Sequence, residues 1–166
     1  MSPRIIFIMG VSGSGKTTVG LELSATTGIP FFDADDYHSA ANKEKMKSGR
    51  PLDDADRQGW LEALNNLARE EAKKTGAIIA CSALKEKYRS ILSNGIEKQV
   101  YWVVLHGSFE TIQERLKSRK QHFMPASLLQ TQFDILEIPS GAMLADINHP
   151  PAEIAADIKV WLDKQD

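Results

Sequence analysis

The sequence GVSGSGKT occupies residues 10–17 and directly follows the apolar run IIFIM at residues 5–9. A glycine, four further residues and then Gly-Lys-Thr form the phosphate-loop pattern, in which backbone N–H groups surround a polyphosphate. Glycine lets the backbone turn tightly and approach a ligand because it has no Cβ atom. A helix that starts at the end of the loop adds unpaired N–H groups and a positive dipole end. We therefore expect nucleotide phosphates to bind here, the alternative being a Gly/Ser-rich turn that matches by chance.

The residue types of the loop also suggest separate roles within it. Lys16 is expected to reach the β- and γ-phosphates of ATP as a point charge, and the Thr17 hydroxyl to ligate Mg²⁺. The residues expected to bind the nucleotide are Gly10, Val11, Ser12, Gly13, Ser14, Gly15, Lys16, Thr17 and Thr18.

The composition is that of a soluble globular protein. With 166 residues, 42% hydrophobic and 25% charged, the chain is long enough for one compact domain with a proper core. The net charge of −2 gives no sign of the strongly basic character that binding to nucleic acid or an anionic membrane requires. The first apolar run is too short for a signal peptide or a membrane span. The single Cys81, expected to pack as a small hydrophobe, fits a reducing cytoplasm.

Five apolar runs alternate with helical patterns along the chain. Strands are expected at residues 4–9, 30–33, 77–81, 100–105 and 142–147, and helices at 16–27, 39–47, 53–74, 85–92, 108–119, 125–136 and 150–162. This alternation predicts an α/β fold with a mostly parallel sheet covered on both faces. Ligands of such sheets gather at the carboxyl ends of the strands, so the candidate site residues should follow the strands.

Three acidic residues follow the second expected strand. Asp33 and Asp35 suit two tasks beside a bound triphosphate, which are to hold Mg²⁺ or its waters and to accept a substrate hydroxyl. The alternative is an acidic turn or a helix N-cap, and Asp36 is the better candidate for the capping role.

Several cationic side chains flank the expected loops. Arg50 and Arg57 stand at expected helix termini, where a guanidinium can grip a carboxylate through two hydrogen bonds. Lys85 follows the third strand, and Arg89 comes four residues later, on the same face of a helix. His38 by itself is only weak evidence for a binding site. The neighbouring lysines need no functional role, because a helix face exposed to solvent explains their presence.

A basic stretch, RLKSRKQHF, covers residues 115–123 between two expected helices. Phosphoryl transfer benefits from cations placed over the β,γ-bridge and from the exclusion of water. A lid at about residues 117–137, with Arg115 at its base and Arg119 within it, would supply both. The alternative is a basic helix C-terminus that the helix dipole favours.

Five blocks of the sequence together resemble the gluconokinase family. They are GVSGSGK at 10–16, DAD at 33–35, GRPL-x-D-x-DR-x-x-WL at 49–61, CSALK-x-x-YR at 81–89 and HF at 122–123. They span almost the whole chain in the family's order, and the second, third and fourth are the specific ones. The resemblance implies a P-loop NTPase fold like that of shikimate and adenylate kinases. This fold has three α/β/α layers, a five-stranded parallel sheet, a substrate-binding helical region at about 36–62 and a helical lid.

The resemblance also implies an activity, which is ATP- and Mg²⁺-dependent phosphorylation of D-gluconate to 6-phosphogluconate for the pentose phosphate and Entner–Doudoroff routes. It further suggests a homodimer. The implied catalytic residues are Lys16, Asp35 and Arg119, and the implied metal ligands are Thr17 and Asp33. Arg115 is implied to face ATP, and the implied substrate-binding residues are Asp35, His38, Arg50, Arg57, Lys85 and Arg89.

Two other functions remain open at this point. A kinase for another small hydroxy acid, such as shikimate, would have the same fold and phosphate loop. Shikimate kinases, however, carry a Gly-rich loop where this chain has CSAL at residues 81–84. A nucleotide-binding module without catalysis would bind ATP but show no acceptor-stimulated ADP release.

Overall fold

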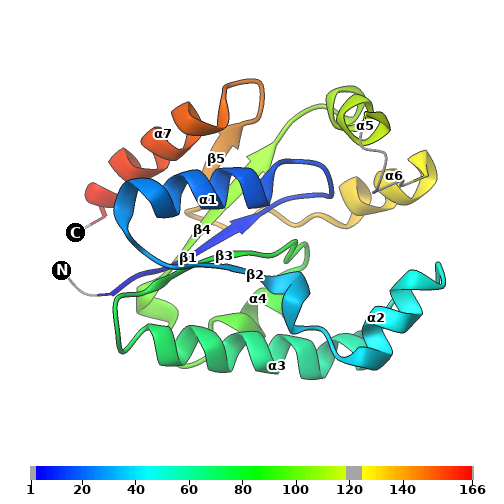
Figure 1. Ribbon diagram of the computed structural model, residues 1–166, viewed down its shortest axis with the longest axis horizontal. Helices are drawn as coiled ribbons and strands as arrows, with labels where there is room; N and C mark the ends of the chain where they lie inside the picture. The colour runs from blue at the N-terminus through cyan, green and yellow to red at the C-terminus, as the bar shows by residue number, and fades with distance from the viewer. Residues whose placement is uncertain (1–2, 119–124, 166) are drawn as a thin grey trace.

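A computed structural model describes residues 3–118 and 125–165 of the chain. Its centre is a five-stranded, all-parallel sheet with the strand order β2-β3-β1-β4-β5 (Figure 1). The strands are β1 (Ile5–Met9), β2 (Phe31–Asp33), β3 (Ala77–Ala80), β4 (Val100–His106) and β5 (Met143–Asp146). The predicted α/β fold with five parallel strands is thereby confirmed.

The central strand explains why the sequence folds into a covered parallel sheet. All five residues of β1 are fully buried, as expected of a strand packed on both faces. Phe7 lies in register with Ile79 of β3 on one side and with Trp102 of β4 on the other. The phosphate loop therefore starts at the carboxyl end of the central strand.

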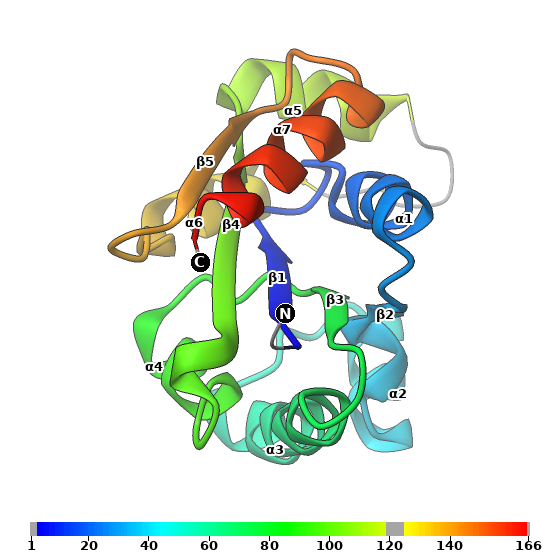
Figure 2. The same cartoon turned by 90° about the vertical axis from the view of Figure 1, so that its left-hand side faces the viewer.

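Helices cover both faces of the sheet, which makes three layers. Helices α1 and α7 lie on one face, and α3 and α4 lie on the other (Figures 1 and 2). Each face has its own core cluster, one containing Leu23 and Ile158 and the other containing Phe7 and Leu64. The helices are α1 (Lys16–Thr27), α2 (Ala40–Lys47), α3 (Asp54–Glu71), α4 (Glu86–Leu92), α5 (Phe109–Lys117), α6 (Ala126–Ile135) and α7 (Pro151–Asp163).

Two short 3₁₀ helices, η1 (Ala34–Tyr37) and η2 (Glu97–Gln99), were not expected from the sequence. The prediction that Asp36 caps the helix after the second strand was wrong. Asp33 caps η1, since its carboxylate accepts a hydrogen bond from the backbone N–H of Asp35, and Ser39 caps α2. The first turn after β2 is thus closed by an acid at the strand end itself.

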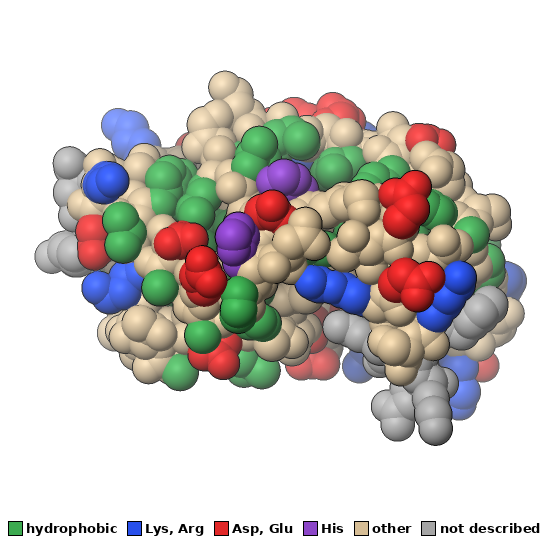
Figure 3. Space-filling model, turned by 90° about the horizontal axis from the view of Figure 1, so that it is seen from above, with side chains coloured by type: hydrophobic (Ala, Val, Ile, Leu, Met, Phe, Trp, Pro, Cys, Tyr) green, Lys and Arg blue, Asp and Glu red, His purple; other side chains and the backbone are tan. Residues whose placement is uncertain are grey.

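The outer surface carries side chains of mixed chemical type. Acidic, basic and apolar side chains are interspersed over the face that Figure 3 shows. No helix in the described parts of the chain has the length and apolar character needed to cross a membrane.

Candidate active site

The phosphate loop has the backbone shape that the sequence predicts. Gly10 and Gly13 adopt positive φ angles of 154° and 81°, which side-chain-bearing residues rarely reach. A Cβ atom on Gly10 would lie 2.7 Å from the Ser14 hydroxyl oxygen and 2.8 Å from a backbone carbonyl of β4. Lys16 Nζ donates to the carbonyl oxygens of Gly10 and Val11, at 3.1 Å each. The loop is therefore a tight backbone cradle with an ammonium group folded over it.

The other polar side chains of the loop differ in exposure. Ser14 is buried, its N–H donates to the Val11 carbonyl at 3.2 Å, and its hydroxyl has no partner among the described residues. Thr18 is exposed on the first turn of α1. The Ser14 hydroxyl is therefore enclosed within the loop, next to Gly10.

The predicted metal ligands lie together between two neighbouring elements. The Thr17 hydroxyl, at the start of α1, donates to Asp33 Oδ2 at 3.4 Å. The other carboxylate oxygen of Asp33 accepts the Asp35 N–H at 3.0 Å, so the cap of η1 fixes the orientation of this acid. A hydroxyl and a carboxylate oxygen are ligand types that suit Mg²⁺. Asp35 itself is exposed on η1.

Cys81 marks the point where the loop and the acids converge. The thiol is buried, and this burial raises its pKa to about 12, so it packs as a small apolar group as predicted. The charges of Lys16, Asp33 and Asp35 all act on this thiol. The phosphate loop follows β1, Asp33 ends β2 and Cys81 follows β3, so these groups lie at the carboxyl ends of three neighbouring strands, where the sheet topology predicts a ligand site.

A cluster of cations surrounds Tyr88 on α4. The Tyr88 hydroxyl donates to Asp54 Oδ1 at 2.9 Å and accepts from Arg57 Nη1 at 3.1 Å. Lys87 forms an ion pair with the same Asp54 carboxylate. The cationic groups of Arg57, Lys85 and Lys87 lie 5.4, 5.8 and 5.7 Å from the Tyr88 ring centroid. Three cations face one carboxylate, so the cluster carries an excess positive charge that suits an anionic ligand.

Burial and hydrogen bonding together favour the neutral form of Tyr88. Burial, followed by the hydrogen bond to Asp54, raises the pKa of the Tyr88 hydroxyl. The hydrogen bond from Lys87 and then that from Tyr88 lower the pKa of Asp54. Sequence reasoning gave neither residue a role. Both residues do stand in the sequence blocks at 49–61 and 81–89, and Asp54 comes three residues before Arg57 and Tyr88 three after Lys85.

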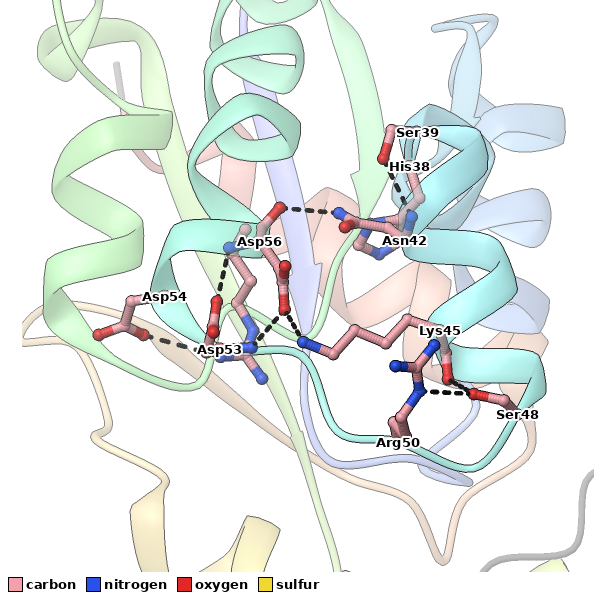
Figure 4. Close-up of polar contacts among 10 residues, drawn as sticks. His38, Ser39, Asn42, Lys45, Ser48, Arg50, Asp53, Asp54 and Asp56 are labelled. Carbon is pink, nitrogen blue, oxygen red and sulfur yellow. Dashed lines mark hydrogen bonds and ion pairs between the residues drawn. The ribbon is translucent and has the colours of Figure 1, made fainter.

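His38 lies at the junction of η1, α2 and α3 (Figure 4). Its ring stacks on Trp60 with a centroid distance of 4.2 Å, and Trp60 Nε1 donates to the Ala34 carbonyl at 2.7 Å. Burial, followed by the charge of Arg57, lowers the pKa of His38. This stack fixes η1, and with it Asp35, against α3.

Arg50 lies against the end of α2. Its Nε donates to the Ser48 hydroxyl at 3.0 Å, and its side chain is exposed (Figure 4). Lys45 forms an ion pair with Asp56 at 2.6 Å, and Asp56 also closes the capping box with Asp53. The α2–α3 connection is therefore held by charge pairing next to Arg50.

The structure places Arg89 inside the protein, unlike the neighbouring Lys85. Its side chain is only 2% exposed, and its guanidinium donates to the Ala83 carbonyl and to Glu86, at 2.8 Å each. Ala83 has a φ of 43°, a left-handed conformation that is uncommon for a residue other than glycine. Arg89 thus holds the loop before Lys85 from inside the protein, with its guanidinium withdrawn from solvent.

Two further residues connect the phosphate loop with α5 and α6. Arg115 donates to the Ile147 carbonyl, and its Nη1 lies 4.0 Å from the position that a Cβ on Gly15 would take. Gln132 accepts the Ser12 N–H at 2.7 Å. Nothing in the sequence pattern singled out Gln132. Arg119 lies outside the described residues, as does the His-Phe block at 122–123.

Comparisons with known proteins agree with this arrangement. A family model described as shikimate kinase matches residues 12–136. The chain is 43% identical to a probable gluconokinase of Xenopus tropicalis, over 97% of this chain and 94% of that protein. A crystal structure of a gluconokinase from Sinorhizobium meliloti 1021 superposes with a TM-score of 0.87 and 40% identity, covering 98% of this chain and 93% of that one.

A more distant structure supports the fold alone. Shikimate kinase from Aquifex aeolicus shares 21% identity with this chain at a TM-score of 0.63, covering 97% of each chain. The nucleotide cradle, the acids beside it and the cationic cluster thus lie on a phosphate-loop kinase fold, with relatives above 40% identity over nearly the whole length. On this basis the chain belongs to the gluconokinase family.

Proposed function

We propose that this protein transfers the γ-phosphoryl group of ATP to the 6-hydroxyl of D-gluconate. The observation that carries the proposal is the convergence of three features at the carboxyl end of the sheet. These features are the phosphate loop, the acids Asp33 and Asp35, and the cationic cluster around Tyr88. Gluconate is a sugar acid with one carboxylate and a chain of hydroxyls, so it matches a cluster with excess positive charge beside an acid.

The donor half of the site rests on the phosphate loop. The backbone N–H groups of residues 10–17 would hold the ATP phosphates, and Lys16 would exchange its carbonyl partners for phosphate oxygens. Thr17 and Asp33 would hold Mg²⁺, which when bound neutralises phosphate charge. The described residues contain no group of three or more His, Cys, Asp or Glu side chains that could hold a metal. Mg²⁺ needs only one or two protein ligands when phosphates supply the others.

In the acceptor half, Arg57 and Lys85 bind the gluconate carboxylate, and Asp35 accepts a hydrogen bond from the 6-hydroxyl. As the bond between that oxygen and the γ-phosphorus forms, the bond from the phosphorus to the oxygen bridging to the β-phosphate breaks. Asp35 receives the hydroxyl proton, and ADP leaves. The transition state is loose, so positioning contributes more than the strength of the base. Arg119 remains the cation that we propose for the transferring group.

An ADP-release assay with a panel of acceptors tests the proposal. Purified protein with ATP and Mg²⁺ is offered D-gluconate, shikimate, related sugar acids or no acceptor. We expect gluconate to give the highest kcat/KM by at least about 100-fold, since a site built for a given set of hydroxyls rejects analogues that leave its polar groups unpaired. Faster turnover with shikimate would assign the site to another acid, and ADP release that no acceptor stimulates would indicate a nucleotide-binding module.

A further inference from the structure

Helix α6 is hydrogen-bonded to the phosphate loop through the side chain of Gln132. The Gln132 amide oxygen accepts the backbone N–H of Ser12 at 2.7 Å, and its amide nitrogen donates to the Ser12 hydroxyl at 3.1 Å. One side chain thus contacts both the backbone N–H and the hydroxyl of a residue 120 positions away in the sequence. A primary amide can make this pair because it offers one acceptor and one donor.

The packing of α6 fixes where Gln132 points. Leu129 is 1% exposed and belongs to the core cluster on the α1 and α7 face. Phe133 lies against Phe109 of α5, with ring centroids 5.8 Å apart. Leu129 and Phe133 anchor one side of the helix, and Gln132, between them at helical spacing, reaches the loop. Gln130 is exposed and donates to Asp134 within the same helix.

The same segment contacts the acceptor side of the site. Directly after α6, the Glu137 N–H donates to the Leu84 carbonyl at 2.7 Å, and Leu84 precedes Lys85 of the cationic cluster. The α6 segment therefore has one hydrogen-bonded contact with the phosphate loop and another with the loop that carries Lys85.

We propose that Gln132 is a positioning residue for phosphoryl transfer, which holds the Ser12 corner of the phosphate loop in its binding shape from helix α6. The inference rests on the proposed function only in that the loop serves ATP. A neutral amide suits this position because it orients a backbone N–H without placing negative charge beside the phosphates. Without it, the Ser12 corner samples other conformations, and ATP must order the loop on binding.

The test compares Gln132→Ala and Gln132→Glu with the matched control Gln130→Ala on the same helix. ATP binding is measured by calorimetry without acceptor, and kcat and both KM values by ADP release with gluconate. Since one neutral hydrogen bond is worth about a 5-fold change in equilibrium, Gln132→Ala should weaken ATP binding about 5- to 10-fold and leave the gluconate KM within about 2-fold. Gln130→Ala should match the unmodified protein.

Gln132→Glu separates positioning from simple helix packing. Its carboxylate keeps the size and can accept from both the N–H and the hydroxyl of Ser12, but it adds negative charge beside the triphosphate. We expect weaker ATP binding than in Gln132→Ala, and a difference that shrinks as salt is added. At high salt, where the added charge is screened, Gln132→Glu should bind ATP better than Gln132→Ala because it keeps the contact with Ser12, and equal binding under that condition would overturn the proposal.

A double-mutant cycle with Ser12→Ala gives the second readout. If Gln132 acts through Ser12, the effects of Ser12→Ala and Gln132→Ala on ATP binding are less than additive. Additive effects, or ATP binding unchanged in Gln132→Ala, would refute the role. Because calorimetry needs no acceptor, the result stands apart from whether gluconate is the substrate.

Discussion

Replacing Tyr88 by Phe removes one oxygen atom at the centre of the cationic cluster. The lost hydroxyl donates to Asp54 at 2.9 Å and accepts from Arg57 at 3.1 Å. Arg57 and Asp54 keep a direct contact at 3.7 Å, so each charge still has a partner of opposite sign. The Arg57 guanidinium, however, loses the hydrogen bond that orients it. A hydrogen bond of this kind contributes about 1–2 kcal/mol. We therefore expect the gluconate KM to rise about 5- to 30-fold.

Steady-state ADP release with each substrate varied in turn measures this effect. The KM for ATP and the kcat should stay within about 3-fold, because Tyr88 orients a binding group and does not face the phosphates. Tyr101→Phe is the matched control, since Tyr101 lies near the amino end of β4 and packs against Trp161. An unchanged gluconate KM in Tyr88→Phe would show that the cluster does not bind the acceptor carboxylate.

Three further predictions concern the residues that support the site. Trp60→Phe leaves the Ala34 carbonyl without its indole donor, so it should lower the free energy of unfolding by about 2 kcal/mol. Urea titration measures this change, and an unchanged unfolding midpoint would contradict it. Native His38 favours the neutral ring, so its stabilising contribution is complete above pH 6.5 and is lost as the pH falls through its lowered pKa. NMR titration should show that pKa below 6.5, and Arg57→Gln should raise it, since a nearby positive charge is removed. Arg89→Lys should lower the free energy of unfolding by about 2–4 kcal/mol, because a buried guanidinium contact to the loop is lost. A larger effect on the gluconate KM than on stability would instead place Arg89 among the residues that bind the substrate.

The fold and the donor side of the site were predictable because their signals are local. A phosphate loop directly after an apolar strand fixes the central strand, the start of α1 and the position of Lys16. Asp33 follows β2, so the rule that ligands gather at strand ends placed it beside Thr17 without knowledge of any tertiary contact. These inferences depend on neighbours in sequence and on the parallel order of the sheet.

The positions of Arg89 and Gln132 were not predictable, because they depend on which helix face becomes buried. Arg89 was grouped with Lys85 from helical spacing, but Lys85 is the N-cap residue of α4 and Arg89 turns into the core. Gln132 depends on how α6 packs against α5, which involves Leu129 and Phe133 but no motif. Helical periodicity gives the angle between side chains and leaves open which of them faces the ligand.

The central claim is that a phosphoryl group passes from ATP to the terminal hydroxyl of gluconate with Asp35 positioning that hydroxyl. Proton-coupled ³¹P NMR spectra recorded during the reaction and at its end test it most directly, with the unmodified protein and with Asp35→Asn. We predict a new triplet from a phosphate ester on a CH₂ carbon. Its rate of appearance should fall about 100- to 10,000-fold in Asp35→Asn. A doublet from a secondary ester, a singlet from inorganic phosphate alone, or equal rates in the two proteins would contradict the claim.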